Sequence, residues 1–325
     1  MKKYSFLLTA ALALLLGGAL ALTGCDIGGG SGDDTTGPTT PTVPTVTTTE
    51  DTEDTEDTED TEPTEAEIMN AADFGADAVI ETLTISNSTQ FGDAKTAIEG
   101  TGGNYVLNIT GTVDVADVSI TPKASAVVSL RGGGTLHRSA GTLSGLFELS
   151  EANSTLILRD AVLQGHDGND TSLVGVGEST AEFVMHGGTI TGNTSGGGGG
   201  VYVYEGTFTM KDGTISGNTA GIGGGGVYVD YNGTFDMKGG TISGNSGEKG
   251  GGVFVDDEYG GVFTKTGGTI NGGGTGVAPD NTATDGDTNG HAVFVNTATT
   301  DLYRDTDAGT GVGLDSDGTG GNWES

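Results

Sequence analysis

Apolar and polar positions alternate in short runs through the second half of the chain. In Phe208-Thr-Met210 two apolar residues flank a polar one, and in Thr214-Ile-Ser216 two polar residues flank an apolar one. A period of two is typical of β-strands, because successive side chains point to opposite faces. In Val227-Tyr-Val-Asp230 we expect the acid to face solvent, which places Val227 and Val229 inside. The pattern therefore predicts short strands that each have one buried face.

These strands recur as a repeat. Three closely similar segments begin at Phe183, Phe208 and Phe235, and a looser copy begins at Phe263, so the steps are 25, 27 and 28 residues. Each copy holds three short strands separated by Gly or Asn turns, which describes one coil of a three-sided parallel β-helix. Weaker copies upstream give about seven coils of about 27 residues between residues 104 and 300. In one coil the side chains expected inside are Phe208, Met210, Ile215, Val227 and Val229, and those expected outside are Thr209, Ser216 and Tyr228.

Both ends of such a stack need covering. A single coil does not bury enough apolar surface to offset the entropy of ordering it, so the coils must stack, and the two end coils present open strand edges. Ala94, Ala97 and Ile98 predict a short amphipathic helix over Phe91–Ile98 that caps the first coil. We expect the segment Thr300–Ser325, which holds the only Trp, to cover the last coil.

The glycine and asparagine turns carry a family resemblance. Each full repeat has a Gly-Gly-aliphatic element and an Ile-(Thr/Ser)-Gly-Asn element, and these are similar to the polymorphic outer-membrane-protein repeat of chlamydial and spirochaetal surface proteins. The resemblance implies a right-handed parallel β-helix of the pectin-lyase-like group and an adhesin-like or surface-display role. The matching elements are Gly199–Val201, Gly225–Val227, Gly251–Val253, Ile190–Asn193, Ile215–Asn218 and Ile242–Asn245.

The first residues indicate export. Lys2 and Lys3 precede the apolar run Phe6–Leu22, as in a secretory signal peptide, and Leu22-Thr-Gly-Cys25 resembles the lipobox of bacterial lipoproteins. We therefore expect residues 1–24 to be removed and Cys25 to carry the lipid anchor. The alternative is a transmembrane anchor with an incidental cysteine. Cys25 is the only cysteine, so a lipidated chain has no disulfide.

Composition divides the rest of the chain in two. Residues 25–67 combine the anchor with Thr, Pro and acidic repeats that have almost nothing apolar to bury, which predicts a disordered tether. Residues 68–325 should form the all-β domain, with its N-terminal cap near residues 91–98. The net charge of -33 disfavours binding to nucleic acid or an anionic membrane surface. We expect a monomer that meets the membrane only through its lipid.

Four aromatic residues are the candidate ligand contacts. They occupy the central position of four equivalent strands, so they should point outward in one solvent-facing column. Such a column suits the apolar faces of sugar rings, and the alternative is that the rings only stabilise the sheet through contacts between coils. The four residues are Tyr202, Tyr228, Phe254 and Phe294.

A second outward column is basic. It could hold an anionic glycan, although we favour the simpler interpretation that its cations offset neighbouring acids such as Asp160 and Asp212. The column comprises Arg131, Arg159, His186, Lys211 and Lys238.

A third column consists of asparagines that close one strand in each coil. Their amides can form hydrogen bonds along the column, and Asn tolerates the left-handed conformation of a sharp corner. We interpret this column as structural. Its members are Asn193, Asn218 and Asn245.

Little in the sequence predicts catalysis or a metal. The segment Asp285–Gly290 matches the first half of a calcium loop, but Asn296 stands where a bidentate Glu is expected. The four histidines form no ligand motif, and no pair of acids is singled out by its spacing. We therefore assign no catalytic residue, metal or cofactor.

The functional hypothesis is a lipid-anchored binding or display module, adhesin-like, that contacts glycan or a host surface. The alternative is a polysaccharide lyase or hydrolase on the same scaffold. We expect it in the bacterial envelope, at the outer membrane or cell surface. The inner membrane stays open because Asp26 resembles a retention signal.

Overall fold

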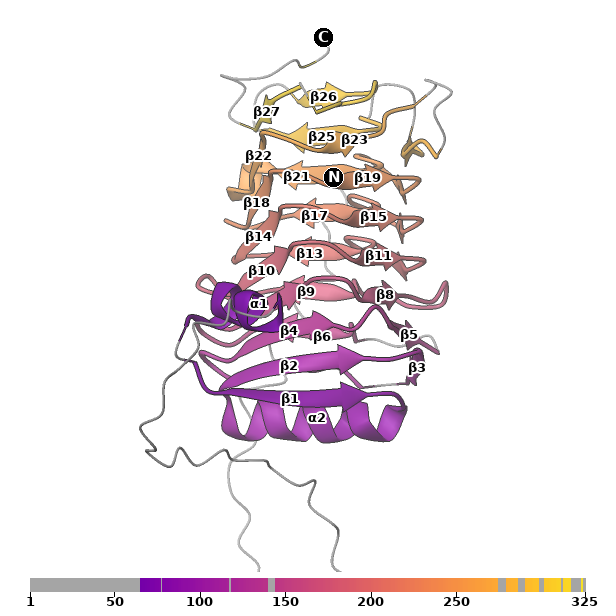
Figure 1. Ribbon diagram of the computed structural model, residues 1–325. Helices are drawn as coiled ribbons and strands as arrows, with labels where there is room; N and C mark the ends of the chain where they lie inside the picture. Colours follow the sequence, from indigo (N-terminus) through magenta and orange to yellow (C-terminus); the bar gives the residue numbers. More distant parts are fainter. Residues whose placement is uncertain are drawn as a thin grey trace, which may run out of the picture. The chain divides into compact units, whose positions relative to one another are not determined.

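A parallel β-helix makes up the folded part of the chain (Figure 1). The structure, a computed structural model, describes residues 65–76, 78–116, 118–139, 144–273, 279–285, 290–297, 301–310, 312–316 and 323. From β4 onward, each coil adds one strand to each of three long sheets of mainly parallel strands, which we call A, B and C, and the four upper coils also add a short strand to sheet D. This confirms the predicted fold of about seven coils of about 27 residues.

The strands of each sheet follow one another along the axis in chain order. Sheet A contains β1 (Ile80–Ile85), β2 (Asn104–Ile109), β4 (Val127–Arg131), β7 (Thr155–Leu158), β10 (Glu182–Met185), β14 (Thr207–Met210), β18 (Thr234–Met237), β22 (Val262–Lys265) and β27 (Leu314–Asp315). Sheet B contains β3 (Thr112–Val115), β5 (Thr135–Arg138), β8 (Val162–Gln164), β11 (Thr189–Thr191), β15 (Thr214–Ser216), β19 (Thr241–Ser243) and β23 (Thr269–Ile270). Sheet C contains β6 (Phe147–Leu149), β9 (Val174–Val176), β13 (Val201–Val203), β17 (Val227–Val229), β21 (Val253–Asp256), β25 (Val293–Asn296) and β26 (Leu302–Arg304). Sheet D contains β12 (Thr194–Ser195), β16 (Thr219–Ala220), β20 (Ser246–Gly247) and β24 (Thr282–Ala283).

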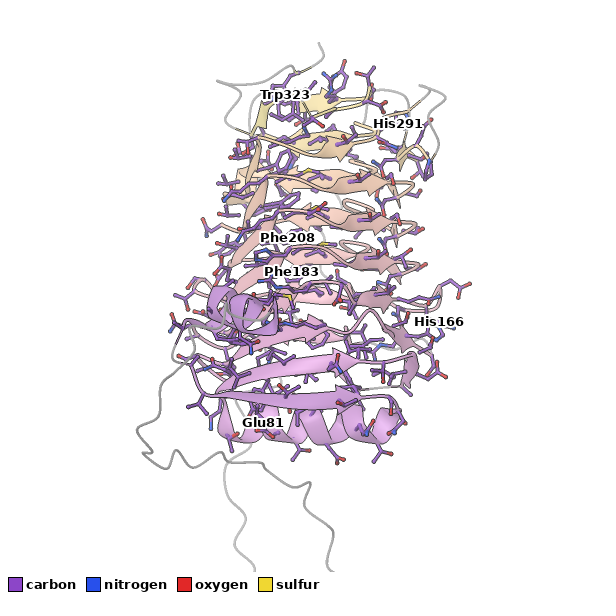
Figure 2. The ribbon with its side chains drawn as sticks, viewed as in Figure 1. Glu81, His166, Phe183, Phe208, His291 and Trp323 are labelled. Carbon is purple, nitrogen blue, oxygen red and sulfur yellow. The ribbon has the colours of Figure 1, made fainter. Side chains whose placement is uncertain are left out.

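Equivalent side chains stack inside the helix. The rings of Phe183, Phe208 and Phe235 lie one above another with centroids 4.7 Å apart, and Phe263 follows at 5.2 Å (Figure 2). This spacing is that of hydrogen-bonded strands, so each ring packs on its copy in the next coil. The five side chains expected inside one coil are all 0% exposed, which confirms the predicted register.

Thr209 points outward as predicted, but it is more buried than expected. It lies on the outer face of sheet A, as expected, but only 6% of it is exposed. Its partners on the two neighbouring strands are Val184 and Asp236. A small side chain between two larger ones on the same face loses most of its contact with water.

The asparagine column forms a continuous ladder inside the corner after sheet B. The side-chain Oδ1 of Asn218 accepts a hydrogen bond from the backbone N–H of Asn193 at 3.2 Å, and Oδ1 of Asn245 accepts from the N–H of Asn218 at 3.0 Å. Asn281 extends the ladder by one coil. The structural interpretation of this column is therefore confirmed. The expectation of left-handed asparagines is wrong, because the preceding glycines take that conformation, with φ of 68°, 65° and 64° at Gly192, Gly217 and Gly244.

The N-terminal end of the helix is covered by α2 (Ser88–Thr101), which lies where the sequence predicts a cap (Figure 1). The side chain of Asn87 accepts a hydrogen bond from the N–H of Gln90 and so caps the first turn. Phe91, Ala94 and Ile98 form its buried face. Strand β1, which the sequence analysis missed, precedes α2 and pairs with β2 over six residues.

The C-terminal end is closed by two antiparallel strands. β26 pairs with β25, β27 pairs with β22, and Trp323 packs against the core (Figure 2). Lys265 occupies the inward position that Met237 holds one coil earlier, and it is 1% exposed. Its ammonium donates hydrogen bonds at 2.8 Å to the carbonyls of Gly309 and Val312. Burial lowers the pKa of Lys265 to about 8. The segment expected to cover the last coil thus does so in its described part.

A second helix, α1 (Glu65–Phe74), lies against β4. It begins within the range 25–67 that the sequence assigns to the tether. The lipobox and Cys25 lie outside the described residues, as does the tether up to residue 64. No helix in the described part of the chain is long and apolar enough to cross a membrane.

Candidate functional site

The four predicted aromatic residues form a column on the outer face of sheet C. Tyr202, Tyr228, Phe254 and Phe294 are register partners on β13, β17, β21 and β25. Successive ring centroids are 5.2, 5.0 and 5.8 Å apart. The structure therefore brings all four together, each in contact with the next.

The upper half of this column does not face solvent, contrary to expectation. Phe254 is 7% and Phe294 is 2% exposed, whereas Tyr202 and Tyr228 are half-buried. The glycine-rich loops fold over the rings: a Cβ on Gly223 would lie 2.7 Å from the ring of Tyr228. Lys249 adds its ammonium 4.8 Å from the centre of the Phe294 ring. The column is thus largely an internal layer between sheet C and its own loops.

Exposed aromatic surface is found instead at the turns between sheets C and A. Tyr204 and Tyr231 follow β13 and β17, and their rings stack at 5.1 Å with an interplanar angle of 11°. They are 37% and 43% exposed, and Tyr259 in η1 (Asp257–Tyr259), on the next coil, is 58% exposed. We call these three residues the tyrosine platform.

The tyrosine platform was not predicted from the sequence, because its residues lie in turns outside the aligned part of the repeat. The available signal was the alternation in Val201-Tyr-Val-Tyr204, which places two tyrosines on the outer face. A further tyrosine then follows Asp230 one coil later.

The backbone at the platform is strained. Tyr231 has φ of 24° and Asn232 has φ of 60°, and non-glycine residues rarely adopt positive φ. Asp230 holds this turn: its carboxylate accepts hydrogen bonds from the Tyr202 hydroxyl and from the backbone N–H of Tyr231, both at 2.8 Å. Strain of this kind persists only where surrounding contacts enforce it, and it is enriched at binding sites.

The hydroxyls of Tyr202 and Tyr228 lie in the field of Asp230. Burial, together with the negative charge of Asp230, raises the pKa of Tyr202 and of Tyr228 above the usual value. Burial also raises the pKa of Asp256, one coil above Asp230, and the charge of Asp230 adds to the effect. Tyrosine hydroxyls and carboxylates, which both form hydrogen bonds with sugar hydroxyls, therefore occur close together at this part of sheet C.

Glu148 lies on the same outward column as Tyr202, two coils below it, with Gly175 between them. A Cβ on Gly175 would lie 2.2 Å from a Glu148 carboxylate oxygen, so the carboxylate rests directly on the glycine backbone. Burial raises the pKa of Glu148 to about 7, although the backbone of Gly145 and the charge of Arg138 favour the ionised form.

This pKa predicts a pH-dependent effect of Glu148→Gln. Since the folded-state pKa lies above the unfolded value of 4.5, stability is fully present below pH 4.5 and is lost as the pH rises to 7. Each pKa unit is worth about 1.4 kcal/mol, so Gln should stabilise the fold by on the order of 3 kcal/mol at pH 8 and have little effect at pH 4. Urea unfolding at the two pH values measures this, with Glu151→Gln on the exposed surface as control. Equal effects of Glu148→Gln at both pH values would contradict the assignment.

The predicted basic column is divided between two roles. Arg131 and Arg159 bind the carboxylate of Asp73 in α1, whose side chain is fully buried and also accepts a hydrogen bond from Ser129 at 2.7 Å. The guanidinium groups hold the pKa of Asp73 below its usual value against the opposing effect of burial. The interpretation that an acid offsets these cations therefore holds, but the acid is Asp73 rather than Asp160 or Asp212.

The upper part of the basic column has weaker contacts. Lys211 Nζ lies 3.4 Å from His186 Nε2, and Lys238 Nζ lies 3.8 Å from Asp236. Burial lowers the pKa of His186, and the charges of Arg159 and Lys211 lower it further. These effects favour the neutral form of His186, so the positive charge of the basic column comes from its Arg and Lys residues.

Metal binding finds no support in the part of the chain that the structure describes, which contains no group of three or more His, Cys, Asp or Glu side chains placed to hold an ion. Residues 286–289 of the calcium-like loop lie outside the described residues.

No protein-family model, curated protein or solved structure matches this chain.

Proposed function

We propose that the protein is a lipid-anchored module of the bacterial envelope that binds glycan through the tyrosine platform. The observation that carries this proposal is the exposed, mutually stacked pair Tyr204 and Tyr231 on a rigid scaffold. Aromatic faces pack well against the apolar faces of sugar rings, and two rings fixed in advance lose little entropy on binding. Glu205, beside Tyr204, supplies a carboxylate that can accept hydrogen bonds from sugar hydroxyls.

The platform can be tested with Tyr204→Ser combined with Tyr231→Asn, where Asn tolerates the positive φ. We expect a roughly tenfold or greater loss of affinity for glycans retained by the wild-type protein, since both stacking faces are removed. The melting temperature should change little, because both rings are exposed. Binding on a glycan array measures the first effect and thermal unfolding the second.

The matched control is Ile222→Ser, which removes an apolar side chain that is 60% exposed in a glycine-rich loop. Unchanged glycan binding by the tyrosine variant would rule out the platform. Slow release of reducing or unsaturated sugars from a retained polysaccharide would favour the polysaccharide-degrading alternative.

The anchor is the second part of the proposal and rests on Leu22-Thr-Gly-Cys25. A Cys25→Ser variant should lose fatty-acid labelling and leave the membrane fraction, because no other thiol is present to accept a diacylglycerol. Metabolic labelling with palmitate and fractionation of cells measure both effects. If the variant stayed in the membrane fraction, the apolar run Phe6–Leu22 would be a transmembrane anchor.

A further inference from the structure

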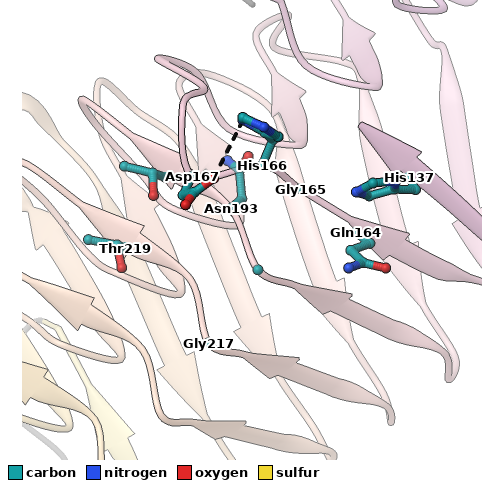
Figure 3. Close-up of a pocket in the computed structure, with 10 residues that line it drawn as sticks. His137, Gln164, Gly165, His166, Asp167, Asn193, Gly217 and Thr219 are labelled. Carbon is teal, nitrogen blue, oxygen red and sulfur yellow. Dashed lines mark ion pairs between the residues drawn. The ribbon is translucent and has the colours of Figure 1, made fainter. Parts of the chain in front are cut away.

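A groove runs along the corner that follows sheet B (Figure 3). The tyrosine platform lies instead at the turns between sheets C and A. Its volume is about 430 Å³. Its lining is composed of hydroxyl, amide, imidazole and glycine groups, with Asp167 as the one acid: His137, Gln164, Gly165, His166, Asp167, Gly192, Asn193, Thr194, Gly217 and Thr219.

Glycine forms the floor of this groove. Gly192 and Gly217 have φ of 68° and 65°, a conformation required by the corner that contains the asparagine ladder. A Cβ on Gly192 would meet only Gln164, at 3.9 Å, and one on Gly217 would come no closer than 3.5 Å to Thr191 Oγ1. The space above the floor is therefore open. One coil higher, Pro279 lies 2.9 Å from the equivalent point on Gly244 and closes that end.

Polar side chains repeat along both walls. On the sheet B side, His137 and Gln164 line the groove and are register partners, and Thr191 and Ser216 continue their row beside it on the next two strands. On the sheet D side, Thr194 and Thr219 pair in the same way. Three coil steps of roughly 4.8 Å give the groove a length of about 14 Å along the axis.

The two histidines present different hydrogen-bonding groups. Nδ1 of His137 lies 2.8 Å from the carboxylate of Asp114, which can only accept, so Nδ1 carries the proton and Nε2 is an acceptor in the neutral ring. Nδ1 of His166 accepts a hydrogen bond from the N–H of Gly168 at 2.8 Å, so its Nε2 carries the proton and is a donor. Gln164 between them has both kinds of group.

We propose that this groove binds a neutral, linear polysaccharide chain lying along the helix axis. Its lining has no large apolar side chain to hold a lipid or an apolar peptide. Its only acid, Asp167, has a side chain that is 95% exposed and therefore contributes little to binding an ion. Donors and acceptors that repeat in every coil match a polymer whose hydroxyls, each both donor and acceptor, also repeat. The site is separate from the tyrosine platform and does not depend on it.

The experiment uses a panel of neutral linear hexasaccharides built from glucose, mannose, galactose or N-acetylglucosamine, with a galacturonic acid hexamer as the charged comparison. The protein contains four histidines, so imidazole NMR signals report the site directly. We expect at least one neutral hexasaccharide to shift the signals of His137 and His166 and to leave those of His186 and His291 unchanged. The charged hexamer should bind more weakly.

Gly217→Asn tests the floor, because Asn tolerates the left-handed conformation and its side chain would fill the groove. Affinity for the bound hexasaccharide should fall roughly tenfold or more, as expected when several hydrogen bonds are lost. The matched control is Gly111→Asn, which has φ of 70° and no atom within 4 Å of its Cβ position, and which should bind normally. If Gly217→Asn does not fold, Gln164→Ala serves as the second test. Gln164 is exposed, so this variant should weaken binding and leave the fold intact.

Two results would overturn the proposal: no shift of the His137 and His166 signals with any neutral hexasaccharide, or unchanged binding by both groove variants. The Tyr204→Ser, Tyr231→Asn double variant should keep full affinity in this assay. A loss there, with none in the groove variants, would assign all glycan binding to the tyrosine platform.

Discussion

An Ile215→Asp variant should lose the cooperative thermal unfolding transition of the wild-type protein. Ile215 is 0% exposed and stacks between Ile190 and Ile242 in adjacent coils. The change removes a buried aliphatic side chain and places a carboxylate where the neighbouring inward side chains are apolar. The expected cost is on the order of 5 kcal/mol or more, comparable to the whole stability of many domains. Circular dichroism against temperature measures it.

The control for this variant is Ser216→Asp, one residue along the same strand. Ser216 is half-exposed on the outer face, so its variant should unfold at nearly the wild-type temperature. A normal transition for Ile215→Asp would mean that the register of the sheet is wrong.

Replacing Asn218 with Ala should destabilise the protein by roughly 3–5 kcal/mol, because several buried polar groups lose partners at about 1–3 kcal/mol each. The Asn218 amide donates hydrogen bonds to the carbonyl of Ile190 and to Oδ1 of Asn245, both at 3.1 Å, and its own Oδ1 accepts from Asn193. Asn218 is 0% exposed, so water cannot easily replace these contacts. Urea unfolding measures the loss. Thr219→Ala at the exposed neighbouring position should cost little, and similar midpoints for the two variants would contradict a stabilising ladder.

The repeat predicted the interior of the fold well. Inward positions such as Phe208 and Ile215 follow from the alternation of apolar and polar residues, because a strand with one buried face has apolar residues at every second position. The asparagine ladder follows from its periodicity in the same way.

Outside the repeat, the two end caps were predicted, but the individual contacts were not. The partner of Arg159 is Asp73, 86 residues away in a helix that has no counterpart in the coils. The burial of Phe254 depends on loops of glycine, whose path is not encoded by any side-chain pattern. Lys265 is an ammonium at an inward position, and it is compatible with that position only because carbonyls of the C-terminal segment accept its hydrogen bonds. Such contacts depend on tertiary structure and have no local periodicity.

The candidate site shows the same division. The column on sheet C was predicted from the repeat, and its four members do meet. Which aromatic surface remains open to a ligand was not predictable, since it depends on the turns that carry Tyr231 and Tyr259. The groove was missed because its floor consists of glycines, which in the sequence are indistinguishable from ordinary turn residues.

The contacts that close the two ends of the helix do not depend on the number of coils between them, and Lys265 shows this for the C-terminal end. The ammonium meets its acceptors only in the last coil, and α2 contributes its apolar face only to the first, whereas the coils between them present nearly identical surfaces to one another. Gain or loss of a whole internal repeat would therefore leave both ends intact. It would lengthen or shorten the groove and the aromatic column by one unit each, without requiring a new cap at either end.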